Sequence, residues 1–486
     1  MTSLRRCPDC GTVSRGPRCS GCDATLRDHH GVRGRWPTIA TALTRDLIRI
    51  NLREQWVLLR FLAKWLVLGS VVGVLAGASS SVFLYGLQLV TSARIDTPGL
   101  LFGLPLGGLA IGLLYHHVGD RSAAGNNLIL DEIHGLAPGM EGEAQVRFVP
   151  RRLAPLVLLG TWVTHLFGGS AGREGTAIQM SGSLTDGFSR MVGLGPADRR
   201  LLLVAAVSGG FAAVFGVPMA GFVFGLEVRS IGRVRYDAIV PALTAAIIGH
   251  LVFQWLDLPH DVTPAYELAP VGLDALLLGK VALAALLFGV ASMVFSELTD
   301  GFKRAFAALL AYPPMRPFAG GLLVVGLALL VGDDAYLGLS LPLIDASLTG
   351  TEVVWYAFAL KLLFTSLTLG AGFQGGEVTP LFVIGATLGA ALAGPLGVPV
   401  ALLASVGFVA VFAAATNTPL ACTIMGVELF GIGAFPYLAV GCVVAYVFSA
   451  HRGIYGAQRI GTPKAPLGGD DPTGTALRDT PRRPPP

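Results

Sequence analysis

Long apolar runs, separated by short polar or glycine-containing segments, dominate the chain from residue 61 to residue 449. Some runs have the roughly 20 residues that a helix needs to cross a bilayer, whereas others are shorter or are interrupted by Gly and Pro. This pattern predicts an all-α polytopic membrane protein in which several helices are broken. The runs cover residues 61–92, 98–118, 153–170, 201–227, 237–256, 273–299, 317–332, 353–370, 377–397, 400–416 and 418–449.

The two ends of the chain differ from this apolar middle. Residues 36–60 are basic and amphipathic, which predicts a helix lying at the membrane surface before the first span. Residues 461–486 are polar and rich in proline, which predicts a disordered tail. Because arginine and lysine gather at both ends, we expect both termini on the cytoplasmic side of the membrane.

The composition supports a membrane protein. Hydrophobic residues make up 53% of the chain and charged residues only 14%, and the mean hydropathy is +0.65, which excludes a set of ordinary soluble domains. Glycine is about twice as frequent as in average proteins, and small residues let membrane helices approach closely or break. The net charge of +4 is small, and no nucleic-acid partner is expected.

Four of the six cysteines stand close together, in 7-CPDCGTVSRGPRCSGC-22. Two CxxC pairs at this spacing favour a structural zinc knuckle over two disulfides in a reducing compartment, because four thiolates complete a tetrahedral Zn²⁺ site. A cysteine-bearing disordered tail is the alternative. The predicted ligands, within a module of residues 1–35, are Cys7, Cys10, Cys19 and Cys22.

A weak internal repeat divides the membrane part into two halves, residues 61–256 and 257–460. The segment AAVFGVPMAGFVFGLE (212–227) aligns with AAATNTPLACTIMGVE (413–428), with proline, alanine and glutamate at matching positions. Duplicated halves with short, glycine-broken segments are typical of transporters whose substrate site lies between discontinuous helices.

Two glycine-rich loops, 172-GREGT-176 and 375-GGEVTP-380, hold Glu174 and Glu377 at comparable places in the two halves. Each loop precedes an apolar helix, whose free backbone N–H groups and positive dipole end favour an anion. A third loop, 125-GNNLILDEIHG-135, has the same form. Together the three loops predict an anion pathway.

A glutamate at membrane depth needs a functional or structural reason, since a charged side chain there costs about 2.5–3.5 kcal/mol on insertion scales. An ionised carboxylate in front of a helix N-terminus can occupy the anion site itself, and a buried one can also take up a proton and move aside. This predicts exchange of an anion for a proton at Glu174. Structural salt bridges, for example between Glu174 and Arg173, are the alternative for both glutamates.

Three motifs in order, GREGT, VSGGFAAVFGVPMAGFVFGLE and TNTPLACTIMGVEL, resemble the CLC chloride channel and transporter family over roughly residues 60–460. The resemblance implies a CLC-type inverted repeat of tilted, broken and re-entrant helices, and a homodimer with one pore per subunit. It also implies that Glu174 gates the pore, and that Tyr455 in 453-GIYGA-457 lines the inner side of the anion site.

The chain departs from the common pattern of that family at three places. It has GNNLI where chloride-handling members usually have GSGIP, GEVTP where they have GxFxP, and Val228 where many have an inner glutamate. These differences resemble the fluoride-exporting branch, the fluoride/proton antiporters of the bacterial inner membrane, in which the glutamate matching Glu377 is associated with proton coupling.

Fluoride is small and tightly hydrated, so removing its water requires several directed hydrogen-bond donors. The donors expected here are the side chains or backbone N–H groups of Asn126, Asn127, Gly175, Val378 and Thr379.

The sequence therefore predicts a fluoride/proton antiporter that exports cytoplasmic fluoride, with membrane lipids and a second copy of the chain as partners and no cofactor for transport. A chloride or nitrate exchanger, or an anion channel of the same fold, is the alternative. A membrane enzyme that uses the N-terminal zinc is a candidate from another class, but the spans contain no further ligand set. Lys361, in an apolar run, is expected to extend its amino group to a surface.

Overall fold

The computed structural model describes most of the chain. The described residues are 5–6, 10, 12–14, 18, 21–22, 52–135, 148–259, 266–268, 271–465 and 472–480. The chain divides into two compact units, residues 1–61 and 62–486. In the first unit, β1 (Arg5–Arg6) pairs antiparallel with β2 (Val13–Ser14).

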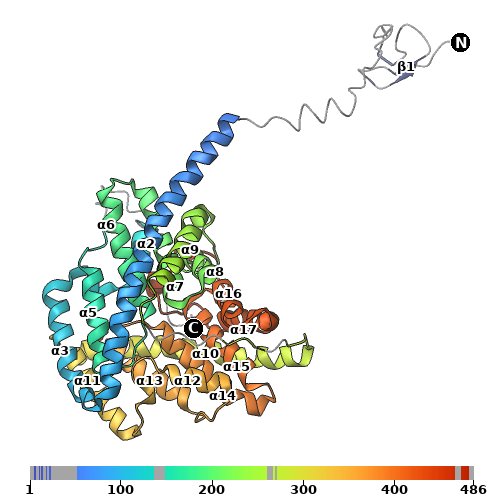
Figure 1. Ribbon diagram of the computed structural model, residues 1–486. Coiled ribbons are helices and arrows are strands. Elements are labelled where there is room, and N and C mark those ends of the chain that lie inside the picture. The colour runs from blue at the N-terminus through green and yellow to red at the C-terminus, as the bar shows by residue number, and fades with distance from the viewer. Residues whose placement is uncertain are drawn as a thin grey trace. The chain divides into compact units, whose positions relative to one another are not determined.

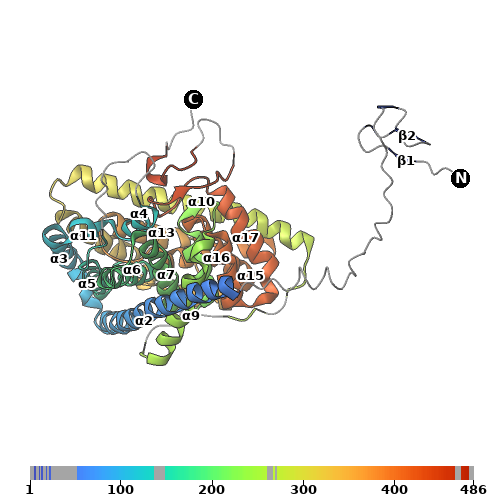
Figure 2. The same ribbon diagram turned by 90° about the horizontal axis from the view of Figure 1, so that it is seen from above.

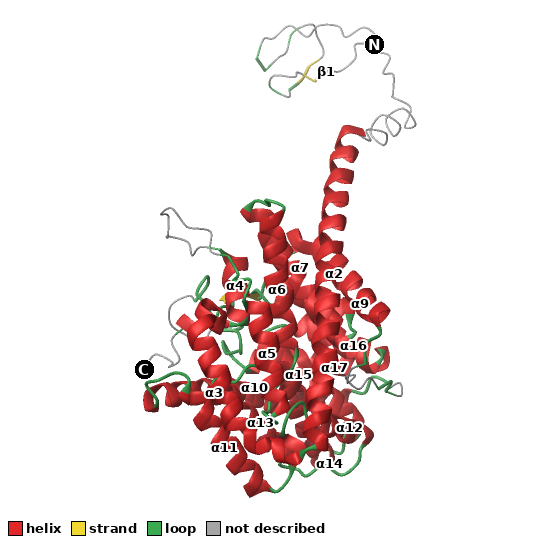
Figure 3. Ribbon diagram, turned by 60° about the vertical axis from the view of Figure 1, so that its left-hand side comes forward, coloured by secondary structure: helices red, strands yellow, loops and turns green. Residues whose placement is uncertain are grey.

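The second unit is almost wholly helical, with short connections between the helices (Figure 3). In the first half of the repeat the helices are α2 (Leu52–Asp96), α3 (Leu104–Leu114), α4 (Asn126–His134), α5 (Leu153–Leu166), α6 (Glu174–Met191), α7 (Pro196–Phe215), α8 (Pro218–Glu227) and α9 (Ile239–Leu256). Helix α2 continues through residue 60, so residues 52–60 share one helix with the first apolar run; residues 36–51 lie outside the described residues.

The part of the chain after α9 is helical as well (Figure 1). Its helices are α10 (Ala275–Leu309), α11 (Met315–Val331), α12 (Leu341–Thr349), α13 (Ala357–Gly370), α14 (Val378–Leu396), α15 (Val400–Thr416), α16 (Pro419–Phe430) and α17 (Phe435–Phe448). Helices α5, α6 and α7 lie side by side in chain order (Figure 2), and α14 packs against α15.

Helix lengths agree with the broken apolar pattern. Within the described part of the chain, five helical segments are long and apolar enough to cross a membrane, and they are Arg53–Asp96, Pro98–Ala124, Tyr236–Leu256, Ala275–Leu309 and Val378–Leu396. Other apolar helices have only 10–17 residues. Short helices leave backbone groups at membrane depth, and these groups must be satisfied by neighbouring protein or water.

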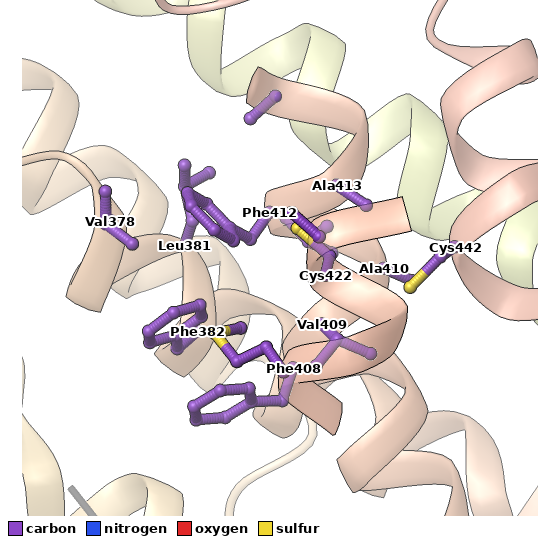
Figure 4. Packing of buried hydrophobic residues seen from close by; sticks show 14 of the residues in the cluster. Val378, Leu381, Phe382, Phe408, Val409, Ala410, Phe412, Ala413, Cys422 and Cys442 are labelled. Atoms are coloured by element: carbon purple, nitrogen blue, oxygen red, sulfur yellow. The ribbon is translucent and has the colours of Figure 1, made fainter. Parts of the chain in front are cut away.

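The core lies where the two halves meet. Phe211 of α7 stacks on Phe412 of α15, the matching position of the repeat, with ring centroids 6.0 Å apart. Phe408 stacks in turn on Phe382 of α14, with centroids 4.0 Å apart (Figure 4). Stacked rings at these distances add to the stabilisation from apolar burial, so helices of both halves share one aromatic core.

Two matching sets of hydrogen bonds join the two halves. The Glu428 carboxylate accepts from the backbone N–H groups of Met219 (3.0 Å) and Ala220 (2.8 Å), at the start of α8. The Glu227 carboxylate accepts from the N–H groups of Leu420 (3.2 Å) and Ala421 (2.9 Å), at the start of α16. Each glutamate thus satisfies donors that its partner helix cannot pair internally.

Residues 472–480, within the segment predicted to be a disordered tail, contact the helical part of the chain. The Arg478 guanidinium binds both oxygens of Asp131 at 3.0 Å, and Leu477 N–H donates to the Gln458 carbonyl at 2.9 Å. Just before the tail, strand β4 (Arg459–Ile460) pairs in parallel with β3 (Ser230–Ile231). These contacts join distant parts of the chain, so the composition of the tail could not predict them.

Candidate anion and proton site

The two glutamate loops are joined directly. Gly172 N–H donates to the Gly376 carbonyl at 2.6 Å, and Gly376 N–H donates to the Gly172 carbonyl at 2.7 Å. A Cβ at Gly376 would lie 3.0 Å from the backbone nitrogens of Glu174 and Gly175, so only glycine allows this approach. The N-termini of α6 and α14 therefore meet at one buried point.

The carboxylate of Glu174 occupies this point. Its Oε2 accepts from the backbone N–H of Thr379 at 3.1 Å and from that of Arg173 at 3.1 Å, and its Oε1 is bonded to the Thr379 hydroxyl. Glu174 is fully buried. The first-turn donors of α14 thus hold a carboxylate in the place where helix-end geometry favours an anion.

Arg173 provides a charged partner for the same carboxylate. Its Nε lies 3.6 Å from Glu174 Oε1, and the Arg173 side chain is also buried. The salt bridge weighed as an alternative therefore exists beside the bonds to Thr379. The two arrangements are compatible, because the carboxylate has acceptor capacity for both.

A small cavity of about 10 Å³ lies between the start of α4 and Tyr455, and its lining residue Asn126 also approaches Gly175 of the Glu174 loop. Its polar lining residues are Asn126, at the start of α4, and Tyr455, which is 3% exposed. The Asn126 Nδ2 atom lies 2.8 Å from the position that a Cβ would take at Gly175, and its Oδ1 has no hydrogen-bond partner among the described residues. A cavity of this size holds about one water molecule or one ion of similar size.

Asn127 makes a different contact from its neighbour. Its Oδ1 accepts from the backbone N–H of Ala457 at 2.9 Å, which fastens the start of α4 to the segment that carries Tyr455. Val378 is buried at the first position of α14, where its backbone N–H is one of the helix-end donors. The donor role expected for the Asn127 amide remains a prediction.

Glu377 lies close to Glu174 but is held differently. It is half-buried at the residue before α14, and its carboxylate has no hydrogen bond or ion pair within the described ranges. The Tyr455 phenol lies within electrostatic range of both glutamates, and Glu377 is in turn within range of Asp300 and Lys303 of α10. The structure thus brings together one bound carboxylate and one carboxylate that is less constrained.

Lys361 lies near the Glu174 loop, because it contacts Ser170 just before that loop. The expectation that its amino group reaches a surface is wrong. Its side chain is fully buried, and the ammonium donates only to uncharged groups. These acceptors are Ser170 Oγ (3.0 Å), Ser340 Oγ (2.8 Å), the Gly338 carbonyl (2.8 Å) and the Tyr336 carbonyl (3.3 Å). The lysine is buried because four oxygens, from Ser170 and from residues 336–340, surround its three N–H donors, which hydropathy alone cannot predict.

Sequence reasoning also missed Gln179 of α6. It is 5% exposed, its Oε1 has no partner in the described part of the chain, and its Nε2 lies 3.3 Å from the Cβ position of Gly125 in the GNN loop. The available signal was an amide inside a helix that follows a glutamate loop.

The predicted zinc module has no support in the structure. Cys7 and Cys19 lie outside the described residues, and Cys10 and Cys22 are exposed. Among the residues that are described, no group of three or more His, Cys, Asp or Glu side chains could hold a metal ion. The four-cysteine site remains a prediction.

Two repeated halves whose helix N-termini converge on one buried acidic site define a membrane transporter of anions. The family model for the voltage gated chloride channel matches residues 107–450, and the chain belongs to this family. The predicted family is thereby confirmed, together with its helical CLC-type fold.

Individual relatives agree with this assignment. The chain is 45% identical over 417 residues to a chloride/fluoride channel protein of Pseudomonas syringae pv. tomato, an alignment that covers 85% of this chain and 90% of the relative. It is 28% identical over 422 residues to the H(+)/Cl(-) exchange transporter ClcA of Vibrio cholerae, covering 79% and 88%. The crystal structure of a CLC-type fluoride/proton antiporter superposes with a TM-score of 0.76 at 36% identity, covering 82% of this chain and 98% of that one.

Proposed function

We propose that the protein exports cytoplasmic fluoride in exchange for protons, with Glu174 alternating between occupying the anion site and carrying a proton. The observation that carries the proposal is the Glu174 carboxylate held by the N–H and hydroxyl of Thr379 at the start of α14. The similarity to a chloride/fluoride channel protein and to a fluoride/proton antiporter supports it.

The exchange step follows from the charge of the carboxylate. When ionised, Glu174 accepts hydrogen bonds from the same donors that a small anion would need, so the two compete for one place. Protonation removes the negative charge and turns one oxygen into a donor, which weakens the hold of Thr379 and of the α14 N-terminus. Fluoride then replaces the side chain, and the protonated glutamate moves aside with its proton.

Glu377 is the proposed second proton carrier. The residue after Glu227, where many chloride-handling members have an inner glutamate, is the buried Val228. Glu227 itself is engaged by the N–H groups of Leu420 and Ala421. Glu377 has no such partner among the described residues, and it lies within electrostatic range of the Tyr455 phenol.

Selectivity for fluoride over chloride is proposed to come from directed donors around a small cavity. The cavity between Asn126 and Tyr455 measures about 10 Å³, and the Asn126 amide can point a donor into it. The Thr379 hydroxyl, bonded to Glu174 in the structure, becomes available to a small ion once that carboxylate leaves. Fluoride forms strong hydrogen bonds with such donors because it is a strong acceptor. Chloride is the alternative substrate, as in the exchanger of Vibrio cholerae.

Efflux from liposomes tests the proposed function. The purified protein is reconstituted, and fluoride, chloride and proton movements are recorded with ion-selective and pH electrodes. Fluoride efflux with proton movement in the opposite direction is expected. Equal chloride and fluoride rates would remove the selectivity claim, and fluoride efflux without proton movement would make the protein a channel.

The assembly and membrane placement belong to the same proposal. We expect a homodimer in the bacterial inner membrane with both termini in the cytoplasm and with membrane lipids around it. Exposed apolar side chains on and beside α16 and α17, including Leu420 (53%), Ile432 (72%) and Phe448 (50%), need cover from lipid or from a second copy. Cross-linking of single-cysteine variants in native membranes distinguishes these two covers.

The zinc knuckle of Cys7, Cys10, Cys19 and Cys22 is kept as a proposal on the spacing of the cysteines alone. Metal analysis of the purified chain tests it: about one zinc per chain is expected, and none after the four cysteines are replaced by serine.

A further inference from the structure

A basic cavity lies between α8 and α9, away from the glutamate loops. It measures about 320 Å³ and is lined by residues of one connecting segment, residues 226–237. Three arginines, Arg229, Arg233 and Arg235, contribute to its wall, and Asp237 is its one acidic lining residue. The volume is far larger than a halide ion requires.

The cavity carries an excess of positive charge. Asp237 is bonded to Arg235 at 2.6 Å, whereas Arg229 and Arg233 have no ion pair within the described ranges. Burial, and to a smaller extent the neighbouring Arg235, Arg459 and Arg200, lower the pKa of Arg229 to about 10, although Asp237 opposes part of this shift. An anion in the cavity would relieve this repulsion.

Arg229 is held in place by a histidine. Its Nε donates to His134 Nδ1 at 3.2 Å, and its backbone carbonyl lies 3.0 Å from His134 Nε2. The two terminal amino groups of the guanidinium have no protein partner in the part of the chain that the structure describes. A guanidinium fixed in this way presents a planar pair of donors.

We infer that this cavity binds a phosphate group, presented by an anionic lipid headgroup or by free phosphate. Arginine side chains recognise phosphate through paired N–H donors, which suits three arginines facing one cavity. Tyr236, at the cavity wall, is 75% exposed, and tyrosine is common at the headgroup level of membranes.

Residues 226–237 of the cavity contact the chain segment that follows Tyr455. Strand β3, within the cavity segment, pairs with β4, and the Gln458 side chain donates to the Val228 carbonyl at 2.8 Å. The stem of Arg233 packs over Gly461, 2.8 Å from the position of a Cβ there. Tyr455 lies just before β4 in the chain. A ligand in the cavity should therefore stabilise the segment that holds this tyrosine.

Thermal unfolding of the full chain in neutral detergent tests the inference. The probes are inorganic phosphate, with potassium chloride at equal ionic strength as its control, and short-chain phosphatidylglycerol, with short-chain phosphatidylcholine as its control. A rise of a few degrees in the unfolding temperature is expected, since a ligand that binds only the folded state stabilises it. A rise with the anionic lipid alone identifies a headgroup site, and a rise with inorganic phosphate identifies a site for the free ion. No rise with either probe overturns the inference.

Variants test whether the rise in unfolding temperature comes from a ligand in this cavity. Arg233→Gln removes a cavity charge without breaking an ion pair among the described residues, and should abolish the rise. Arg233→Lys keeps the charge but loses the paired donors, and should give a smaller rise. Arg304→Gln, at an exposed arginine of α10, should respond like the wild type. A full rise in Arg233→Gln would place the bound anion elsewhere and overturn the assignment.

Discussion

Glu227 and Glu428 cap each other's helices. Each carboxylate stands near the C-terminal end of its own helix and accepts two backbone N–H bonds from the start of the other, at 2.8–3.2 Å. These bonds hold the two short helices α8 and α16 together. Both glutamates therefore have a structural role that the sequence repeat alone does not reveal.

Glu227→Gln and Glu428→Gln should each lower the stability of the protein by about 1–2 kcal/mol, because charge-assisted bonds to helix-end donors become neutral ones. Thermal unfolding in detergent measures the loss. The number of protons moved per fluoride should stay unchanged. A changed ratio at unchanged stability would show that one of these carboxylates carries protons instead.

Gly175→Ala should reduce fluoride transport strongly, since the new methyl group would lie 2.8 Å from Asn126 Nδ2 and 3.3 Å from the Gly376 Cα. The methyl group would push the GNN loop away from the cavity. Gly187→Ala is the matched control on the same helix, because nothing lies within 4 Å of its Cβ position. It should be neutral or stabilising by up to about 1 kcal/mol. Equal transport by both variants would separate Gly175 from the site.

Lys361→Met should destabilise the protein by about 3 kcal/mol or more, because it leaves several buried oxygens without their donor. Lys361→Arg should also be poorly tolerated in a cage built for one ammonium. The control is Lys280→Met, since Lys280 makes one bond of 3.3 Å to the Gly397 carbonyl. Similar unfolding temperatures for the Lys361 and Lys280 variants would contradict the buried cage.

Glu377→Gln should leave fluoride movement in place but reduce the accompanying proton movement. The reason is that a glutamine amide, unlike a carboxylate, cannot take up and release a proton. Fluoride and proton fluxes are recorded together in liposomes. Glu352→Gln, at an exposed loop position, serves as the comparison. Full coupling in Glu377→Gln would exclude this residue as a proton carrier.

The helical membrane fold and the two glutamate loops could be predicted because both depend on local signals. Apolar runs mark the helices, and glycine with glutamate before an apolar run marks each loop. The partners could not be predicted in the same way. Thr379 is 205 residues from Glu174, and the bond from Ala457 to Asn127 spans 330 residues.

The burial of Lys361 could not be predicted from the sequence either. A lysine in an apolar run is expected to extend to water, since an unpaired buried ammonium is costly. Its burial depends on Ser170, Gly338 and Ser340, which only the folded chain brings together. Buried polar cages of this kind have no signature in hydropathy.

The exchange of fluoride for protons at Glu174 is tested most directly by Glu174→Gln in liposomes loaded with fluoride. Fluoride efflux and external pH are followed at the same time, beside wild type at equal protein density. Since glutamine can neither carry the proton nor mimic the anion, we expect proton movement to fall to the level of empty liposomes. Fluoride efflux coupled to protons at the wild-type ratio would contradict the central role of Glu174.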